Sequence, residues 1–335
     1  MEQSLVTAIE QMYNCRVTRL WVRRTVWHCE TNRGTWIIKG YDDFSLAAWV
    51  TRLAALLHGR GFTNVVRYVP TIQHVPVFKW NDRYMTAMEH LPGRNGSYFH
   101  RADIMRAVQT LAHFHLLSSG IPYGPPPETG VPLLAKWEKR LEDFQNVCTQ
   151  LENQELPRTR LTQLVQSNAS HIQEEANYVL TIARNSLLTQ DYKDALRDQR
   201  ISHKDLASHN FLIHDKRTSL IDLDAAGYDT PIVDLVQLLN RALVLQYWDM
   251  DVFEQAISAY REIRPLTEEQ IALIFLLVRF PDNFLREVNG VYDSGLNPHV
   301  NRVEYYVSIL LKGKKRRASF FSGYERFLYQ ASHQA

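Results

Sequence analysis

The chain has 335 residues, a length that suits two structural lobes better than one simple core. Hydrophobic residues make up 45% of it and charged residues 22%, which is ordinary for a globular protein. The formal net charge is only +2, so no global field favours a nucleic acid or a membrane surface as a partner. The three cysteines lie far apart and form neither a zinc spacing nor a disulfide framework, which suits a reducing compartment.

No segment of the sequence resembles an export signal or a membrane anchor. The first residues, MEQSLVTAIEQMYN, lack an apolar core preceded by basic residues. The longest strongly apolar run, residues 271–278, is too short to cross a bilayer. We therefore expect a cytoplasmic protein with no membrane span and no nucleic-acid partner.

The first 90 residues predict a small lobe rich in strands. Residues 4–13 have the pattern of a short amphipathic helix. Two arms rich in Trp, Val, Ile and Thr flank a turn signal at residues 32–34, which predicts a β-hairpin that carries Lys39 on its second arm. Helical spacing over residues 44–58 predicts a second helix, and three short apolar segments after it predict further strands. Residues 1–90 are thus expected to form an α+β N-lobe.

The remaining residues, 91–335, predict a larger and mostly helical C-lobe. Residues 101–117 have helical periodicity and are followed by a proline-rich loop. Residues 133–190 predict long helices with polar faces, which we interpret as a helical insert. Short strands and loops are expected over residues 201–226, and helices again over residues 234–332.

The segment ISHKDLASHNFLIHDKRTSLIDLDAA, residues 201–226, carries the groups that phosphoryl transfer requires. That reaction needs a carboxylate for the attacking hydroxyl, a carboxylate and an amide oxygen for magnesium, and a lysine for the phosphates. Asp205 opens a loop, Asn210 follows it by five residues, and Asp222 comes after two apolar β segments. Together with Lys39 on the earlier strand, these residues occur in the matching order.

The motif H-x-D-x-x-x-x-N followed by I-D-x-D resembles the aminoglycoside phosphotransferase and choline kinase group, which shares the protein-kinase fold. The segments MEHLPGR at residues 88–94, LAHFH at residues 111–115 and YDTPIVDLVQLL at residues 228–239 fit the same group. The resemblance implies a bilobal α+β protein-kinase-like fold. It also implies an ATP-dependent phosphotransferase that acts on a hydroxyl of an unidentified small molecule or protein.

A closer resemblance is to the CotS-type spore-coat kinase-like family, and it runs from about residue 30 to residue 290. The matching pieces are Thr31, Gly34 and Lys39 in the hairpin, Lys136 and Trp137 at the start of the insert, the IDLD segment, and RFPDNFL at residues 279–285. This resemblance implies a connection with the bacterial spore coat. It adds spore-coat proteins as expected partners and the coat as a second expected location.

The resemblance also assigns roles by position. The assigned residues are the catalytic base Asp205, the magnesium ligands Asn210 and Asp222, the phosphate-binding Lys39, and the hinge Met88, Glu89 and His90, whose backbone would bind the adenine of ATP. Asp234 resembles an aspartate that caps the following helix, and the role of Asp224 stays open. His203 is expected to hydrogen-bond the backbone of the catalytic loop, and His209 and His214 are expected at the surface.

Two departures from the kinase pattern affect Lys39 and the phosphate loop. Residues 44–81 contain no Asp or Glu, so no helix glutamate can pair with Lys39, and another group such as Asp222 must orient it. No glycine-rich loop precedes Lys39, and Arg23 and Arg24 stand at the expected tip instead, where they could bind phosphates or an anionic partner.

A third departure is Lys204, which stands where the group usually has glycine. Lys204 could lower the pKa of the catalytic carboxylate, contact phosphate or point to solvent. The acceptor is not readable from the sequence: several acids lie between residues 138 and 175, but acidic helix faces are common.

Two alternative functions stay open at this point. The first is a kinase-fold scaffold or coat protein that binds partners with weak or no catalysis, and the missing helix glutamate motivates it. The second is a metal hydrolase that would use His203, Asp205, His209 and Asp222 as its ligands, although this alternative leaves the order of strand, hinge and loop unexplained.

Overall fold

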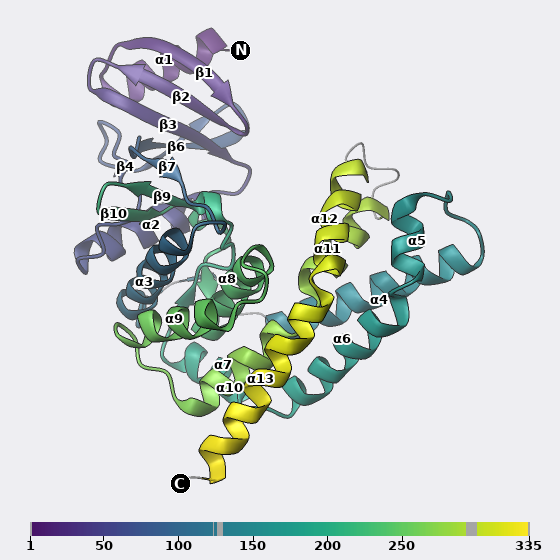
Figure 1. Cartoon of the computed structure of the whole chain (residues 1–335). Coiled ribbons are helices and arrows are strands. Elements are labelled where there is room, and N and C mark those ends of the chain that lie inside the picture. Colours follow the sequence, from purple (N-terminus) through teal and green to yellow (C-terminus); the bar gives the residue numbers. More distant parts are fainter. Residues whose placement is uncertain (1, 123, 126–129, 293–299, 334–335) are drawn as a thin grey trace.

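The computed structural model describes residues 2–122, 124–125, 130–292 and 300–333, and its N-terminal part is built on one antiparallel sheet of six strands (Figure 1). The strand order is β1-β2-β3-β6-β4, and β5 pairs with residues 83–86 of β6. The strands are β1 (Val17–Arg23), β2 (Val26–Thr31), β3 (Gly34–Tyr41), β4 (Tyr68–Val69), β5 (Val77–Trp80) and β6 (Arg83–Glu89). The predicted hairpin is β2–β3, and Gly34 at its turn has a φ of +126°, which side chains rarely tolerate.

Alternation along the strands gives this sheet two buried faces. Ile38 and Ala87 pack with helix α1 (Glu2–Tyr13) in one apolar cluster. Tyr41 and Met88 point the other way, into the main core with helix α2 (Phe44–Gly59). Lys39 lies two residues from Tyr41 and therefore shares its face, which is the face turned toward the rest of the chain.

Two small sheets follow the N-terminal part and frame the polar loops. Strands β7 (Arg94–Asn95), β9 (Phe211–His214) and β10 (Arg217–Leu220) pair in the order β10-β9-β7. Strands β8 (Ile201–Ser202) and β11 (Gly227–Tyr228) form a two-stranded ladder. The loop between β8 and β9 ends in the short 3-10 turn η1 (Ser208–Asn210), and the loop after β10 contains η2 (Leu223–Ala225). Both polar loops of the predicted site are thus anchored at each end by strands.

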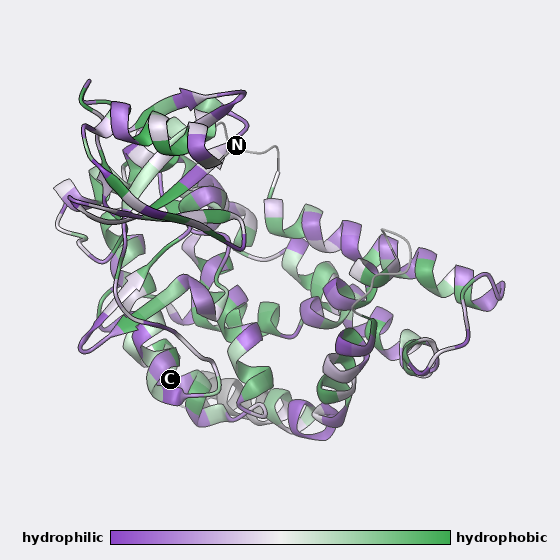
Figure 2. Cartoon of the chain, turned by 90° about the horizontal axis from the view of Figure 1, so that it is seen from above, coloured by the Kyte–Doolittle hydropathy of each residue, from purple (hydrophilic) through white to green (hydrophobic). Residues whose placement is uncertain are grey.

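The C-terminal part is helical. Its central helices are α3 (Arg101–Leu117), α8 (Pro231–Leu245), α9 (Met250–Arg261) and α10 (Glu268–Val278). The others are α4 (Pro132–Glu152), α5 (Arg160–Gln166), α6 (Ala169–Arg184), α7 (Leu188–Arg197), α11 (Asp282–Tyr292), α12 (Val300–Lys312) and α13 (Lys314–His333). In Figure 1, α4, α5, α6, α11 and α12 extend away from the sheet. Figure 2 shows that the extending helices carry both apolar and polar residues along their length, as expected for helices buried on one side.

The observed architecture confirms the predicted fold class, an α+β chain with a strand-rich N-terminal part and a helical C-terminal part. The helices expected at residues 4–13, 44–58 and 101–117 are present as α1, α2 and α3. Parts of the expected proline-rich loop, and residues 293–299 of the expected C-terminal helical stretch, lie outside the described residues. Among the residues that are described, no helix is both long enough and apolar enough to span a bilayer.

Candidate active site

His203 joins the two polar loops of the site. Its Nε2–H donates to the backbone oxygen of Ile221 at 3.0 Å, and its Nδ1 accepts from the backbone N–H of Asp205 at 3.3 Å. These two bonds fix the neutral imidazole with its proton on Nε2. The prediction that His203 supports the loop backbone is confirmed, as is the surface position of His209 and His214.

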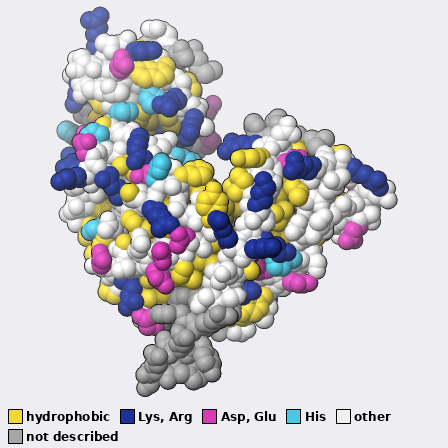
Figure 3. Space-filling view, in the orientation of Figure 1, with side chains coloured by type: hydrophobic (Ala, Val, Ile, Leu, Met, Phe, Trp, Pro, Cys, Tyr) yellow, Lys and Arg dark blue, Asp and Glu magenta, His cyan; other side chains and the backbone are white. Residues whose placement is uncertain are grey.

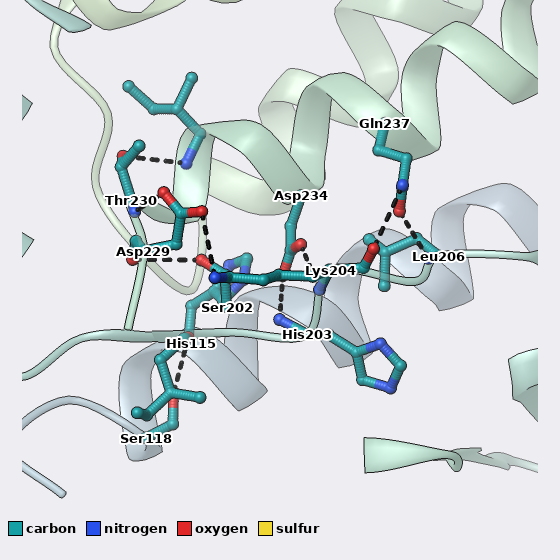
Figure 4. A network of polar contacts seen from close by, with 12 residues as sticks. His115, Ser118, Ser202, His203, Lys204, Leu206, Asp229, Thr230, Asp234 and Gln237 are labelled. Atoms are coloured by element: carbon teal, nitrogen blue, oxygen red, sulfur yellow. Dashed lines mark hydrogen bonds and ion pairs between the residues drawn. The ribbon is translucent and has the colours of Figure 1, made fainter. Parts of the chain in front are cut away.

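Asp234 is buried beneath the loop and holds its backbone (Figure 4). Its two carboxylate oxygens accept from the backbone N–H groups of His203 at 2.6 Å and Lys204 at 2.8 Å. His115 Nε2 donates to the same carboxylate at 2.9 Å. Burial would raise the pKa of Asp234, but the hydrogen bond from His115 and those from the loop outweigh it and lower that pKa. The anion is therefore stable at neutral pH.

The predicted capping role of Asp234 is wrong. Helix α8 is capped by Thr230, whose hydroxyl accepts from the backbone N–H of Ile232, and Asp234 lies in the first turn of that helix. The side chain of Asp234 reaches across to another segment instead. From the sequence alone, an aspartate near the start of a helix is expected to cap that helix. The actual partners of Asp234 in the loop lie thirty residues away, so the sequence does not reveal them.

Lys204 occupies a left-handed backbone position, with a φ of +65°. This conformation explains why glycine would be suited to the position. Figure 4 shows the Lys204 side chain extended toward Asp229, and its Nζ lies 3.5 Å from Asp229 Oδ2. Burial raises the pKa of the Asp229 carboxyl to about 6, although Lys204 opposes the shift. Lys204 thus points along α8 and not into solvent.

Hydrogen bonds join Asp205 and Asn210 within the loop. The Asn210 Nδ2 donates to the backbone oxygen of Asp205 at 3.0 Å and to its Oδ2 at 3.1 Å. Arg241 Nη1 lies 3.5 Å from Asp205 Oδ1. The Asp205 side chain is 43% exposed, so its carboxylate remains accessible. Because the buried Asn210 side chain uses its nitrogen for these bonds, its amide oxygen is left to accept or to ligate.

Asp222 meets Lys39 at the junction between the sheet and the polar loops. Lys39 Nζ lies 2.7 Å from Asp222 Oδ1, so the suggestion that Asp222 orients this lysine is confirmed. Asp222 adopts a left-handed backbone with a φ of +66°, which turns the chain sharply after β10. The backbone N–H of the preceding Ile221 donates to the backbone oxygen of Asn210 at 2.9 Å, which keeps Asp222 beside Asn210.

Asp224 is a second partner of Lys39 that the sequence did not assign. Its Oδ2 lies 2.7 Å from Lys39 Nζ, and its Oδ1 accepts from the Tyr41 hydroxyl at 3.2 Å. Burial would lower the pKa of Lys39, but Asp222 and then Asp224 outweigh it, so the pKa of Lys39 is raised. The sequence showed Asp224 as the second acid of the IDLD segment, but it did not show that Lys39 is its partner.

Helix α2 reaches the site through Trp49 and carries no acid. The Trp49 Nε1–H donates to the backbone oxygen of Ala226 at 2.8 Å in a buried bond. The bond ties α2 to the segment that follows Asp224. Arg23 and Arg24, at the turn between β1 and β2, are exposed.

The predicted hinge lies at the end of β6. Met88 is buried between β3 and β4. The backbone N–H of Glu89 donates to Arg67 O at 2.9 Å, and that of His90 donates to Thr35 O at 3.0 Å. Both donors therefore have partners within the protein. The next donor, the backbone N–H of Leu91, has no acceptor among the residues that the structure describes, and the sequence offered no signal for it.

The residues present fit magnesium better than a histidine-ligated metal. Asp222 supplies a carboxylate and Asn210 an amide oxygen, which are hard ligands that suit Mg²⁺. Over the described part of the chain, no three His, Cys, Asp or Glu side chains gather as a metal site. The metal hydrolase alternative lacks its ligand cluster there, because the ring of His203 is engaged and His209 is exposed.

Solved structures share this architecture at low sequence identity. An aminoglycoside phosphotransferase from Alicyclobacillus acidocaldarius has a TM-score of 0.85 at 15% identity, covering 97% of this chain and 96% of that one. A spectinomycin phosphotransferase in complex with ADP and spectinomycin has a TM-score of 0.65 at 12% identity, covering 93% and 98%. At such identities the likeness establishes the fold.

Sequence comparison adds a short match and a long one. Spore coat protein S of Bacillus subtilis is 38% identical over 66 residues, which span 19% of this chain and 19% of that relative. The chain thus matches about a fifth of the length of this curated relative. Residues 19–266 match the model of the phosphotransferase enzyme family, and this region includes both polar loops and Lys39. The chain therefore belongs to the phosphotransferase enzyme family.

Proposed function

We propose that the protein is a magnesium- and ATP-dependent phosphotransferase that transfers the γ-phosphate to a hydroxyl group. The observation that carries the proposal is the meeting of Lys39 with Asp222, next to the loop that presents Asp205 and Asn210. The spectinomycin phosphotransferase of the same fold has been solved with ADP and with AMP, which supports a nucleotide ligand. Residues 1–90 would form the N-lobe, and residues 91–335 the C-lobe with its insert at about 133–190.

Each side chain has a defined task in this mechanism. Asp205 accepts the proton of the acceptor hydroxyl while the hydroxyl oxygen bonds to the γ-phosphorus and ADP leaves. Lys39 neutralises phosphate oxygens, and Asn210 and Asp222 would hold the metal. Magnesium, when bound, would supply further positive charge to the phosphates. Catalysis would rest mainly on positioning and charge neutralisation.

The adenine would be held by the hinge, Met88 to His90, extended by one residue. The N–H groups of Glu89 and His90 already donate to backbone oxygens, whereas that of Leu91 has no acceptor among the described residues. We therefore include Leu91 as the backbone donor of the adenine site, with Met88 as its buried wall.

A link with the spore coat is part of the proposal. It is supported by the 66-residue match to Spore coat protein S and by the hairpin, insert and IDLD motifs. Coat proteins would then be partners or acceptors. A kinase-fold scaffold without catalysis is the second candidate, favoured by the absence of any acidic residue from α2.

The first test is thermal unfolding with and without Mg-ATP, comparing wild type with Asp222→Asn. A ligand that binds only the folded state at one hundred times its Kd stabilises it by about 2.7 kcal/mol. We expect a magnesium-dependent rise in Tm for the wild type and none for Asp222→Asn. Asp205→Asn should keep the rise and lose transfer. The absence of any shift in wild type at millimolar nucleotide would favour the scaffold.

A further inference from the structure

A cavity of about 240 Å³ lies beside the catalytic loop, between the start of α4, one side of α8 and the start of α11. Its walls include Lys136, Lys204, Asp229, Gln237 and Asp282. Pockets for drug-sized ligands usually measure about 300–1,000 Å³, so this one suits a smaller molecule. The exposed lining is more apolar than polar, with charged side chains set among apolar ones, and the charges restrict the chemistry of that molecule.

Helix α8 connects the cavity with Asp205. Gln237 accepts from the backbone N–H of Leu206 at 2.6 Å and donates to the backbone oxygen of Lys204 at 3.3 Å (Figure 4). One turn further along, Arg241 reaches the Asp205 carboxylate. The loop that carries Asp205 is thus held to the same helix that lines the cavity. Lys204, the chain neighbour of the proposed base, lines the cavity, whereas Asp205 itself is not among its lining residues.

The far wall of the cavity is rigid before any ligand arrives. Trp137 stacks on Phe280 with ring centroids 4.1 Å apart and planes 8° from parallel. Asn240 donates to the backbone oxygens of Val278 and Phe280, and Asn283 donates to Asn240. These buried bonds fix α4, α8 and the start of α11 to one another. A ligand would therefore need to order few side chains of this wall when it binds.

The acids of the cavity are all neutralised within the protein. Asp282 pairs with Arg140, and Asp229 lies 3.5 Å from Lys204. Asp234 is buried and accepts from two backbone N–H groups and His115. None of these three carboxylates is left to attract a cation.

Lys136, in contrast to these acids, is a charged side chain of the cavity wall without a partner among the described residues. Its side chain borders the cavity from an exposed position on α4, and it forms no hydrogen bond or ion pair with any residue of the described ranges. Desolvation and then the charge of Arg140 lower the pKa of Lys136, Asp282 opposes the shift, and Arg241 and Arg286 add to it, so cations outnumber acids around this side chain. Figure 3 shows Lys and Arg side chains on both sides of the hollow between the N-terminal part and helices α11 and α12.

The acids of the insert do not compensate for this charge. Glu138 pairs with Arg184, Asp143 with Lys139, and Glu175 with Arg279 and Arg317. None of these three acids lines the cavity. A cationic acceptor would therefore meet the ammonium group of Lys136 and no unpaired carboxylate on the cavity wall, while Arg140, Arg241 and Arg286 are each paired with an acid. Like charges brought together cost free energy, whereas an anion would gain it.

We propose that this cavity binds the acceptor, and that the acceptor is a small hydroxyl compound with an anionic group, a phosphate or a carboxylate, held by Lys136. The inference rests on the proposed function for the transfer step itself. In that step the acceptor hydroxyl loses its proton to Asp205, its oxygen forms a bond to the γ-phosphorus, and the bond from that phosphorus to the bridging oxygen of ADP breaks.

The test measures binding without nucleotide, so that it does not depend on catalysis. Three probes share one skeleton: glycerol 3-phosphate, glycerate and uncharged glycerol. Isothermal titration of the full chain should show binding of at least one anion and none of glycerol. Lys136→Gln should weaken the anion at least tenfold. Lys139→Gln, on the same helix but outside the cavity, should leave it unchanged. Comparing the affinities for glycerol 3-phosphate and glycerate shows whether the cavity binds a phosphate or a carboxylate.

A second control separates the cavity from the nucleotide site. Lys39→Ala should weaken Mg-ATP and leave the anion unaffected, whereas Lys136→Gln should do the reverse. The proposal is overturned if neither anion binds at millimolar concentration, if glycerol binds equally well, or if Lys136→Gln binds like the wild type. Anion binding that is lost only in Lys39→Ala also overturns it. Wild type that binds the anion but not Mg-ATP would sink the proposed function alone.

Discussion

Lys39 and Asp224 form an ion pair of 2.7 Å, although Lys39 lies in a strand of the N-terminal sheet and Asp224 in the turn after Asp222. In protein kinases a glutamate on the helix after this strand holds the corresponding lysine. Helix α2 carries no acidic residue here, and the lysine pairs with Asp222 and Asp224 instead. The Tyr41 hydroxyl, which donates to Asp224, fixes the carboxylate on its other side.

This geometry predicts that Asp224→Asn weakens Mg-ATP binding about tenfold, which corresponds to about 1.4 kcal/mol. Asparagine keeps the shape of the Asp224 side chain and can still accept from the Tyr41 hydroxyl. It removes the negative charge that would position Lys39 when Asp222 binds magnesium. Titration calorimetry with Mg-ATP measures the change. Asp42→Asn serves as the control, because Asp42 lies just past the same strand and is 90% exposed. Equal affinity in Asp224→Asn and wild type would show that Asp222 alone orients the lysine.

Asp234 should be essential for stability, because three donors depend on it. Asp234→Ala would leave the backbone N–H groups of His203 and Lys204 and the His115 ring without their acceptor in a buried site. Removing one partner from a buried charged network costs about 3–5 kcal/mol, so we expect a loss of that size in urea unfolding. Asp215→Ala is the control, because the Asp215 side chain is 87% exposed. A loss below about 1 kcal/mol would contradict this account.

Asp229 should make the protein less stable as the pH rises. Its folded pKa of about 6 lies above the ordinary value of 3.8, so the folded state holds the proton more tightly than the unfolded chain. The stabilisation is complete below about pH 4 and is lost as the pH rises through 6, and a shift of two units corresponds to about 3 kcal/mol.

Asp229→Asn removes this titration and keeps an oxygen for the backbone N–H of Thr230. Unfolding free energies of wild type and Asp229→Asn should therefore converge near pH 4, and the variant should be the more stable protein at pH 7.5. Parallel pH profiles of the two proteins would show that Asp229 keeps an ordinary pKa.

The sequence predicted those parts of the site that depend on local spacing. Gly34 identified the hairpin that carries Lys39, and the five-residue step from Asp205 to Asn210 predicted the loop, although not the hydrogen bonds from Asn210 to Asp205. Of the pairs between distant segments, the sequence suggested the one between Lys39 and Asp222 but not the others. The ion pair between Lys39 and Asp224 depends on how the sheet lies over the turn, and the lack of an acceptor for the N–H of Leu91 among the described residues depends on strand register. Asp234 was misassigned for the same reason, because its partners approach it only after folding.

Trp49 provides the last prediction, since it is the link between α2 and the turn that holds Asp224. Trp49→Phe keeps most of the apolar contact but leaves the buried backbone oxygen of Ala226 without its donor. An unsatisfied buried group costs about 1–3 kcal/mol, so urea unfolding should show a loss in that range. Mg-ATP affinity should fall as well, because the turn that positions Lys39 loses its anchor.

Trp80→Phe is the matched control for Trp49. The Trp80 ring packs edge-on against Trp27, and its indole N–H forms no hydrogen bond to the residues described. Its replacement should leave nucleotide affinity unchanged. If Trp49→Phe lowers stability but not affinity, Trp49 only holds α2 in place, and Lys39 depends on Asp222 and Asp224 without help from that helix.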